Sequence, residues 1–418
     1  MTFIYYAVYV IFLLISISGE YLKRPKGLRK IWLDERRGLY PLGKNISNGQ
    51  KRIWIHAVSV GEVISCVPLI NKLRVEQNVS ITLSVITDTG RQVAFNKFPS
   101  GINIRYLPFD LPIFLNRALK IERPDIFIII ETEIWPGLIT CLNQAGVPIL
   151  ILNGRISGKS FIGYKRLRFY LKDILSKVSY FGMQNEIYKA RIIEMGAEAK
   201  RVEAIGNFKF DTVPHTETPD WFLKGQVIVA GSTHAGEEEI ILRAYGQIRK
   251  KIKDLTLIIA PRHPERFKEV EALIKSMDYR FARKSEHDNP SSEPDCNIIL
   301  LDTIGELAKV YGLADICILG GSFIPIGGHN LLEPASWGKP IICGQYMDNF
   351  PMTDEFVTGG ATWLVDSESI VEKITSLLLD NTLRKEMGDN AKRLFDKNSG
   401  AISHAIDVIN NVPQIRFF

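Results

Sequence analysis

Residues that could bind a nucleotide cluster in the carboxyl-terminal half of the chain. The segment GGSFIPIGGHNLLEPASWGKP, residues 320–340, follows an apolar run that is typical of a buried strand. Its glycines let backbone N–H groups approach an anion closely. Asn330 is a typical N-cap for a short helix over LLEPASWG, and Glu333 could accept hydrogen bonds from two ribose hydroxyls. The segment therefore predicts an anion-binding helix N-terminus that holds a phosphate and a ribose.

Carboxylates follow two apolar runs in the amino-terminal half. Glu62 lies in the first turn of a helix expected after the run 52–57, where a carboxylate is also favoured simply as a helix-terminal charge. The small residues around it would let a substrate approach, so the position also suits a general base. Glu131 and Glu133 end the strongly apolar run 125–131, where burial without partners would be costly. A charged pair at such a place indicates a site rather than packing.

A phosphate ligand is also expected at PRHPER, residues 261–266. Arg262 directly follows the apolar run 255–262, and arginine binds phosphate in a bidentate manner. His263 by itself is more typical of an ordinary loop residue.

Other chemistries find less support in the sequence. The seven histidines are not at metal-ligand spacing, and no D-x-D or paired-cysteine motif occurs, so we expect no metal requirement. Ser59 in AVSVG resembles a nucleophile elbow in which alanine replaces the first glycine, which leaves a serine hydrolase as an alternative. The five cysteines are scattered and mostly apolar in context, as expected for reduced thiols in the cytosol.

The elements that must position these residues alternate between strands and helices. Apolar runs at 52–57, 81–87, 103–109, 125–131 and 147–153 form a first series, and runs at 226–232, 255–262, 297–302, 315–321 and 340–344 form a second. Runs that are apolar throughout indicate parallel sheets covered on both faces. The fold class is therefore α/β, with two Rossmann-like, doubly wound domains and a predicted cleft at the carboxyl ends of their strands.

The boundaries of these domains follow from composition. Residues 1–20 are uncharged almost throughout and precede seven basic residues, which predicts a membrane anchor with a cytoplasmic flank. A cleaved signal peptide and a buried first helix are the alternatives. The proline- and threonine-rich residues 209–225 predict a linker between a first domain at 21–208 and a second at 226–418. The 46% hydrophobic and 23% charged content is ordinary for a globular protein and argues against general disorder, and the formal net charge of +6 is mild.

Eight motifs occur in the order found in 3-deoxy-D-manno-octulosonic acid (Kdo) transferases. They are HAVSVGE, ETEIWP, LNGRIS, GNFKFD, GSTHAGEE, PRHPER, DTIGEL and GGHNLLEPASWGKP, and the resemblance runs from about residue 20 to 400. It implies an inverting glycosyltransferase of the GT-B type. Such an enzyme transfers Kdo from CMP-Kdo to the lipid A precursor (lipid IVA) in lipopolysaccharide biosynthesis. It also implies attachment to the inner membrane, with the catalytic domains on the cytoplasmic side.

The resemblance also implies roles for particular residues. The first domain would bind the acceptor, with Glu62 as general base. The second would bind the CMP-sugar, and His329 would be a neighbour of the site, neither metal ligand nor base. Matching motif positions further imply transition-state stabilisation by Glu131 and Lys209, and CMP contacts from Pro261, Arg262, Ile304, Gly305, Glu306, Asn330, Leu331, Leu332 and Glu333.

The expected partners are CMP-Kdo as a co-substrate, the lipid A precursor and inner-membrane lipids, with no cofactor and no nucleic acid. The segment 158–172 interleaves basic and aromatic residues, as expected for contact with an anionic acceptor or membrane, although a solvated helix face would look similar. Three alternatives remain: a transferase of the same architecture that uses a UDP-sugar, a hydrolase built on Ser59, and a non-catalytic membrane-tethered binding protein.

Overall fold

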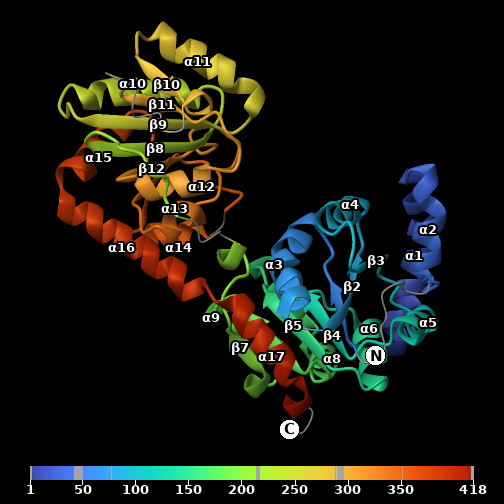
Figure 1. Cartoon of the computed structure of the whole chain (residues 1–418). Helices are drawn as coiled ribbons and strands as arrows, with labels where there is room; N and C mark the ends of the chain where they lie inside the picture. Colours follow the sequence, from blue (N-terminus) through green and yellow to red (C-terminus); the bar gives the residue numbers. More distant parts are fainter. Residues whose placement is uncertain are drawn as a thin grey trace. The chain divides into compact units, whose positions relative to one another are not determined.

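The computed structural model describes residues 2–41, 50–76, 78–212, 217–287, 289, 296–350 and 352–415. The chain forms two compact units, shown in Figure 1. The first comprises Met1–Thr212 together with the chain from Asn398 onward, and the second comprises Val213–Lys397.

The first unit contains a seven-stranded, fully parallel sheet in the order β3-β2-β1-β4-β5-β6-β7. Its strands are β1 (Lys51–His56), β2 (Val79–Val85), β3 (Asn103–Tyr106), β4 (Ile126–Ile130), β5 (Ile149–Gly154), β6 (Tyr180–Met183) and β7 (Val202–Ala204). Its helices are α1 (Thr2–Lys23), α2 (Lys26–Arg36), α3 (Val60–Glu76), α4 (Asp88–Lys97), α5 (Pro112–Glu122), α6 (Pro136–Gln144), α7 (Gly158–Arg166), α8 (Arg168–Leu175), α9 (Glu186–Met195) and α17 (Ala401–Ile415), with short 3-10 turns η1 (Ala199–Arg201) and η2 (Phe210–Thr212).

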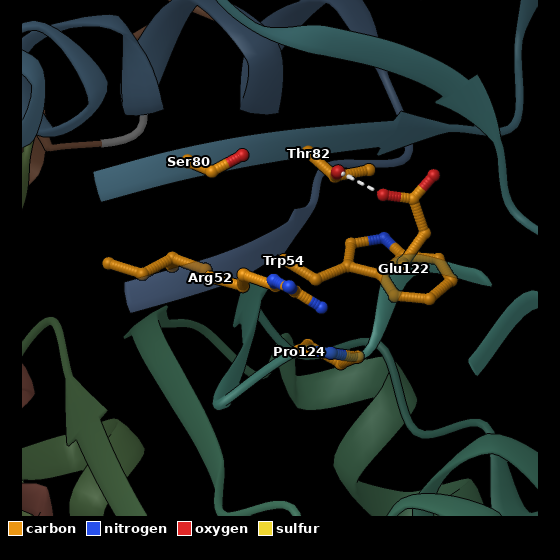
Figure 2. A pocket seen from close by; sticks show the side chains of 7 residues that line it. Arg52, Trp54, Ser80, Thr82, Glu122 and Pro124 are labelled. Atoms are coloured by element: carbon orange, nitrogen blue, oxygen red, sulfur yellow. Dashed lines mark hydrogen bonds between the residues drawn. The ribbon is translucent and has the colours of Figure 1, made fainter. Parts of the chain in front are cut away.

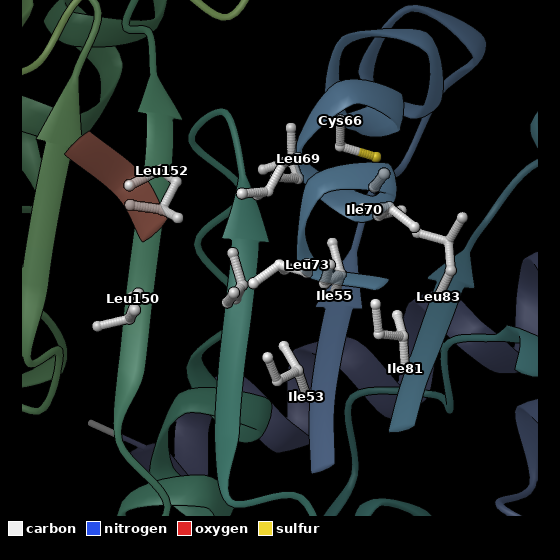
Figure 3. Packing of buried hydrophobic residues seen from close by; sticks show 14 of the residues in the cluster. Ile53, Ile55, Cys66, Leu69, Ile70, Leu73, Ile81, Leu83, Leu150 and Leu152 are labelled. Carbon is white, nitrogen blue, oxygen red and sulfur yellow. The ribbon is translucent and has the colours of Figure 1, made fainter. Parts of the chain in front are cut away.

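Both faces of this sheet are buried, which explains why its central strands are largely apolar on both sides. Ile53 and Ile55 of β1 face a core formed with α3 and α17, whereas Trp54 between them faces a second core formed with α5, α6, α8 and α9. Figure 3 shows Leu69 and Leu73 of α3 packed over the first face. The continuous burial confirms the expectation of a parallel, two-sided sheet.

The second unit repeats this architecture with the strand order β10-β11-β9-β8-β12-β13-β14, again fully parallel. Its strands are β8 (Gln226–Thr233), β9 (Leu255–Pro261), β10 (Phe281–Arg283), β11 (Ile298–Leu300), β12 (Ile316–Leu319), β13 (Ile341–Cys343) and β14 (Thr362–Leu364). Its helices are α10 (Glu237–Arg249), α11 (Phe267–Ser276), α12 (Leu307–Val310), α13 (Leu332–Ser336), α14 (Thr353–Thr358), α15 (Ile370–Leu379) and α16 (Asn381–Asn398), with 3-10 turns η3 (Pro264–Arg266), η4 (Lys284–Glu286) and η6 (Tyr311–Leu313).

The predicted α/β class with two Rossmann-like, doubly wound domains is confirmed, and all ten predicted runs contain a strand. Four strands were not predicted: β6, β7, β10 and β14. Each is only three or four residues long, too short to show a clear periodic pattern. The five cysteines are free thiols, as expected.

The predicted end of the second domain at residue 418 is wrong, because α17 belongs to the first unit. Ala405, Ile406 and Ile409 of α17 are buried in the core over the first sheet. Asp211 fixes the start of this helix by accepting hydrogen bonds from the N–H groups of Gly400 and Ile402, each at 2.6 Å. A helix that follows the second domain in sequence therefore completes the core of the first.

The predicted linker at 209–225 is also partly wrong. Residues up to Thr212 form η2 and belong to the first unit. Residues 213–216 lie outside the described part of the chain, as do residue 288 and residues 290–295 of the predicted surface loop at 284–295.

The amino-terminal helix α1 lies along the first unit. The segment Ile4–Lys23 is long and apolar enough to cross a membrane, with a mean hydropathy of 1.5. Its residues Tyr9, Leu13, Ile17 and Tyr21, four positions apart, pack against the core of the first unit. The hydroxyl of Tyr5 donates to Asp110 at 2.5 Å. One face of α1 is therefore docked on the protein, and the opposite face is exposed and apolar.

Candidate active site

Each sheet has one point where the strand order reverses, and Glu62, Glu131 and the segment from Asn330 to Glu333 follow strands at these two points. In the first sheet the reversal lies between β1 and β4, and in the second it lies between β8 and β12. Ligands of doubly wound sheets bind at the carboxyl ends of strands at such a reversal, since the loops there diverge.

Glu62 lies in the first turn of α3, just beyond the end of β1. Its carboxylate accepts a hydrogen bond from the N–H of Val58 at 2.7 Å and one from the hydroxyl of Ser59 at 3.0 Å. Burial raises the pKa of Glu62 to about 7, and the nearby charges of Glu131 and Glu133 contribute in the same direction. A carboxyl group with this pKa can accept a proton at neutral pH.

Glu131 follows β4 in a left-handed backbone conformation, with a φ of 61°. A residue other than glycine pays a steric cost in this region, and the cost is accepted only where surrounding structure holds the backbone. The N–H of Glu131 donates to the carbonyl of Leu152 at 2.9 Å, which continues the β4–β5 pairing. Burial and the charge of Glu131 raise the pKa of Glu133. The structure thus brings Glu62, Glu131 and Glu133 together at one sheet edge.

Lys209 is placed at the same edge by a network of amide side chains. Asn153, which is buried and has a φ of 58°, accepts a hydrogen bond from the N–H of Phe208 at 3.1 Å. The side chain of Gln184 donates to the carbonyl of Asn153 and accepts from Asn207. Asn207 in turn accepts from the N–H of Lys209 at 3.0 Å. The motifs LNGRIS and GNFKFD contain Asn153 and Asn207, but their positioning role could not be inferred from composition.

The geometry around Ser59 does not support a serine hydrolase. The hydroxyl of Ser59 is bonded to a carboxylate, and no imidazole contacts it among the described residues. His56, three positions earlier, is fully buried and its Nδ1 lies 3.0 Å from the hydroxyl of Ser84. The base that an activated serine requires is therefore not in place.

In the second unit, Arg262 lies beside the segment from Asn330 to Glu333. The N–H of Arg262 donates to the carbonyl of Thr233 at 2.9 Å, which holds it at the end of β9 next to β8. Burial raises the pKa of Glu333, against the hydrogen bond from Asn330 and the positive charge of Arg262. Two of the predicted CMP-binding segments are thus neighbours in space.

The predicted anion-binding helix N-terminus is not formed as expected. Asn330 accepts a hydrogen bond from the N–H of Leu332 at 3.1 Å, but it lies one residue before the N-cap position, Leu331. Helix α13 has only five residues, too few for a substantial helix dipole. Leu331 and Leu332 are buried, so their side chains serve the core.

The first part of the glycine-rich loop already binds an anion from the protein itself. The carboxylate of Glu237, which is fully buried, accepts hydrogen bonds from the N–H groups of Gly321 at 2.7 Å, Ser322 at 3.0 Å and Phe323 at 2.9 Å. These donors are therefore not available to a phosphate. The sequence alone did not indicate Glu237, because GSTHAGEE reads simply as an acidic helix start.

The third predicted segment, Ile304 to Glu306, lines an open hollow of about 570 Å³. Gly305 has a φ of 88°, and Ile304 is exposed. The side chain of Glu306 accepts a hydrogen bond from the hydroxyl of Thr303. The hollow is polar and is lined by Lys284, Ser285, Glu286, His287, Thr303, Ile304 and Glu306.

The first unit contains a much smaller hollow, which is not a substrate site. It lies beside the starts of β1 and β2, at the edge opposite Glu62, and its volume of about 10 Å³ is close to that of a single water molecule. Figure 2 shows Thr82 directed at Glu122, to which it donates a hydrogen bond of 2.6 Å. Thr82 and Glu122 thus satisfy one another without a ligand.

Within the described residues, no group of three or more histidine, cysteine, aspartate or glutamate side chains is arranged to hold a metal ion. The expected metal independence stays a prediction.

Comparison with known proteins identifies the family. Residues 32–212 match the family described as 3-deoxy-D-manno-octulosonic-acid transferase (kdotransferase). The chain is 32% identical over 389 residues to the 3-deoxy-D-manno-octulosonic acid transferase of Haemophilus influenzae, covering 90% of both chains. It is 40% identical over 311 residues to a bifunctional glycosyltransferase/methyltransferase of Fusobacterium nucleatum, covering 72% of this chain but only 48% of that protein.

Among solved structures, the MurG protein of Acinetobacter baumannii has a TM-score of 0.54 at 13% identity, covering 86% of this chain and 99% of that one. At this identity the likeness concerns the fold alone, and it agrees with the GT-B architecture of two Rossmann-like units. The extended similarity in sequence, the two reversal-point sites and the shared fold lead to one conclusion: this chain is a glycosyltransferase that belongs to the 3-deoxy-D-manno-octulosonic acid transferase family.

Proposed function

We propose that this protein transfers Kdo from CMP-Kdo to the lipid A precursor, lipid IVA, with Glu62 as the general base. The single observation that carries this proposal is the position of Glu62, a buried carboxyl group with a pKa of about 7 at the strand-order reversal of the first sheet. Family membership supports Kdo as the sugar.

The reaction is a single displacement. Glu62 accepts the proton of a primary hydroxyl on the acceptor sugar as the hydroxyl oxygen attacks the anomeric carbon of Kdo. The carbon–oxygen bond to the phosphate breaks, its electron pair goes to the phosphate oxygen, and CMP leaves. Because attack and departure occur on opposite faces, the anomeric centre inverts. Lys209 would stabilise the negative charge of the donor in the transition state.

Glu131 supports this step by adding to the proton affinity of Glu62. Burial of Glu62 is the main cause of its raised pKa, and the nearby charge of Glu131 acts in the same direction. Val58 and Ser59 donate hydrogen bonds that orient the carboxylate. A base held in one orientation loses no freedom when the hydroxyl arrives.

The second unit would hold the CMP portion of the donor. Glu333 would accept the ribose hydroxyls, Arg262 would contact the phosphate, and the polar hollow at Ile304–Glu306 would receive part of the nucleotide. None of these interactions requires a metal ion, so we propose that a chelator leaves the activity intact.

The acceptor carries phosphates and acyl chains, and the first unit has a surface of matching character. In α7 and α8, Phe169 is 87% exposed, and Ile162 and Leu167 are also exposed between basic side chains. Each basic residue near an anionic membrane surface contributes about 1 kcal/mol to binding. We propose that this surface and the exposed face of α1 rest on the cytoplasmic face of the inner membrane.

The test is mass spectrometry of the product formed by the purified full-length protein from CMP-Kdo and lipid IVA, with and without a chelator. We expect a mass gain of one or more Kdo residues in both cases. Glu62→Gln should lower turnover by about 10²- to 10⁴-fold, whereas Ser59→Ala, which removes one hydrogen bond to the carboxylate of Glu62, should lower it far less. Loss of activity in Ser59→Ala with retention in Glu62→Gln would contradict the proposal, as would clear preference for a UDP-sugar.

A further inference from the structure

Three histidines gather in the second unit, outside the residues assigned above. The Nε2 atoms of His234 and His329 are 2.7 Å apart, and the two rings are nearly parallel, with an interplanar angle of 4°. The ring of His263 lies 5.2 Å from that of His234, edge to face. From the sequence, we expected His329 to be only a neighbour of the site. In the structure it pairs directly with the imidazole of His234.

This pair spans the strand-order reversal of the second sheet. His234 follows β8, which ends at Thr233, and His329 lies in the loop that follows β12. The strands β8 and β12 are direct neighbours in the sheet. The two imidazoles therefore lie where a doubly wound domain binds its ligand.

Glu237 holds His234 in place, together with the loop residue Gly321 that lies beside the ring of His329. One oxygen of this buried carboxylate accepts hydrogen bonds from the N–H of His234 at 2.9 Å and the N–H of Gly321 at 2.7 Å. Gly321 has a φ of 68°, and a Cβ atom there would lie 2.9 Å from the ring of His329. A larger residue would displace the ring, so the glycine leaves room for the pair.

The pair has one proton between its two facing nitrogens and further ring nitrogens for a ligand. A separation of 2.7 Å allows an N–H to N hydrogen bond but not two protonated nitrogens face to face. Both rings are only partly buried. No hydrogen bond to the Nδ1 atom of either ring is found in the part of the chain that the structure describes.

The surroundings keep this pair from gaining a positive charge in the absence of an anion. Burial, together with the charges of His234, Arg262 and His263, lowers the pKa of His329 to about 4. Burial also lowers the pKa of His234. The charged groups near the ring of His234 are Arg262, Arg266 and Glu238. The carboxylate of Glu238 forms an ion pair with Arg266 at 2.6 Å. An uncompensated positive charge is thus disfavoured here, and a bound anion would reverse this balance.

We propose that the His234–His329 pair binds the phosphate of the nucleotide and takes up a proton from solvent as it does so. This inference rests on the proposed function for the identity of the nucleotide. The donor phosphate carries one negative charge, and a second develops on its oxygen when the bond to the sugar breaks. An Nδ1–H group of the protonated pair donates a hydrogen bond to the phosphate, while the acceptor proton goes to Glu62. No covalent bond to either histidine forms.

Calorimetric titration of the full-length protein in detergent tests the pair directly. CMP, UMP, inorganic phosphate and cytidine are each titrated at pH 7.5 in two non-phosphate buffers of different ionisation enthalpy, which measures the protons taken up on binding. For the wild type we expect uptake of up to one proton with CMP and none with cytidine. His329→Gln should abolish the uptake and weaken CMP binding about tenfold, with cytidine binding unchanged.

The matched control is His404→Gln in the first unit, where His404 pairs with Glu203 at 3.0 Å; its uptake should equal that of the wild type. CMP binding without proton uptake, or unchanged uptake in His329→Gln, would overturn the inference and leave the proposed function standing. Failure of CMP to bind, with UMP binding accompanied by uptake that His329→Gln removes, would overturn the CMP specificity and support the pair. If no phosphate compound binds with uptake, the pair has no such role.

Discussion

At the scale of single residues, the proton affinity of Glu62 is the feature most closely tied to chemistry. Its carboxylate receives two hydrogen bonds, which favour the charged form, yet burial outweighs them and raises the pKa to about 7. The nearby carboxylates of Glu131 and Glu133 act in the same direction. A group that is half protonated near neutral pH can both accept and release a proton during turnover.

The pH dependence of activity follows from this pKa. Glu62 is protonated, and therefore inactive as a base, below pH 7, so log(kcat/KM) should rise with a slope of one and level off above about pH 7. Ser59→Ala removes a donor that favours the carboxylate, which should move the midpoint to higher pH. The measurement is an initial-rate profile from pH 5 to 9. A flat profile, or a midpoint near the ordinary value of 4.5, would contradict the assignment.

The raised pKa of Glu62 also makes stability depend on pH, and stability falls over the pH range in which activity rises. Because the folded state holds the proton of Glu62 more tightly than the unfolded state, its contribution to the free energy of unfolding is present below about pH 4.5 and is lost as the pH rises towards 7. Denaturant unfolding of Glu62→Gln should show a smaller loss of stability over this range than the wild type.

At the scale of elements, α1 is apolar on both its docked face and its free face. One face packs on the first unit through Tyr9, Leu13 and Ile17. The opposite face exposes Ile11 at 58% and Ile15 at 76%, in a helix otherwise poor in charge. A helix docked along the protein in this way would enter a membrane with its free face.

Substitutions on the two faces of α1 should have different effects. Ile15→Lys places a charge on the free face and should reduce flotation of the protein with anionic liposomes while leaving its unfolding temperature nearly unchanged. Leu13→Asp places a charge in the docked face and should lower the unfolding temperature. If Ile15→Lys destabilised the protein as much as Leu13→Asp, the free face would be packed rather than available for a membrane.

At the scale of the whole molecule, the order of the chain and the order of the units differ. The chain completes the second sheet and then returns to the first unit, where α17 covers the same face as α3. Asp211 accepts hydrogen bonds from the N–H groups of Gly400 and Ile402 at the start of α17. Nearer the end of the helix, the ammonium group of Lys51 donates to the carbonyl of Ile409. The whole second unit therefore lies, in sequence, between the two segments that form the first unit.

Removal of the residues after Lys397 should accordingly destabilise the first unit rather than the second. Truncation uncovers the apolar core beside Ile55 and Leu73, so amide protons of β1 and β4 should lose protection in hydrogen exchange. The amide protons of β8 and β9 should keep their protection. Asp407→Ala, on the exposed side of α17, is the control and should behave as the wild type. Equal loss in both units would indicate that they unfold together.

Local pattern was sufficient for much of the fold and part of the site. Strands such as β4 and β9 are recognisable because both of their sides are buried, so nearly every residue is apolar. Glu131 and Arg262 were identifiable because each directly follows such a strand, and Glu62 because it lies in the first turn of the helix after one. The short strands β6 and β14 carry too few residues for a pattern, and their existence depends on neighbours in the sheet.

By itself, the sequence determined which segments are buried and which polar residues stand at their ends, since burial and strand ends leave a mark on consecutive residues. Only the tertiary structure decided that Glu237 occupies the loop N–H groups 84 to 86 positions away, and that His234 meets His329, 95 positions away. It also decided the place of α17 and the pKa of Glu62. These properties depend on contacts and burial between distant parts of the chain, and no local pattern encodes the distance between two side chains.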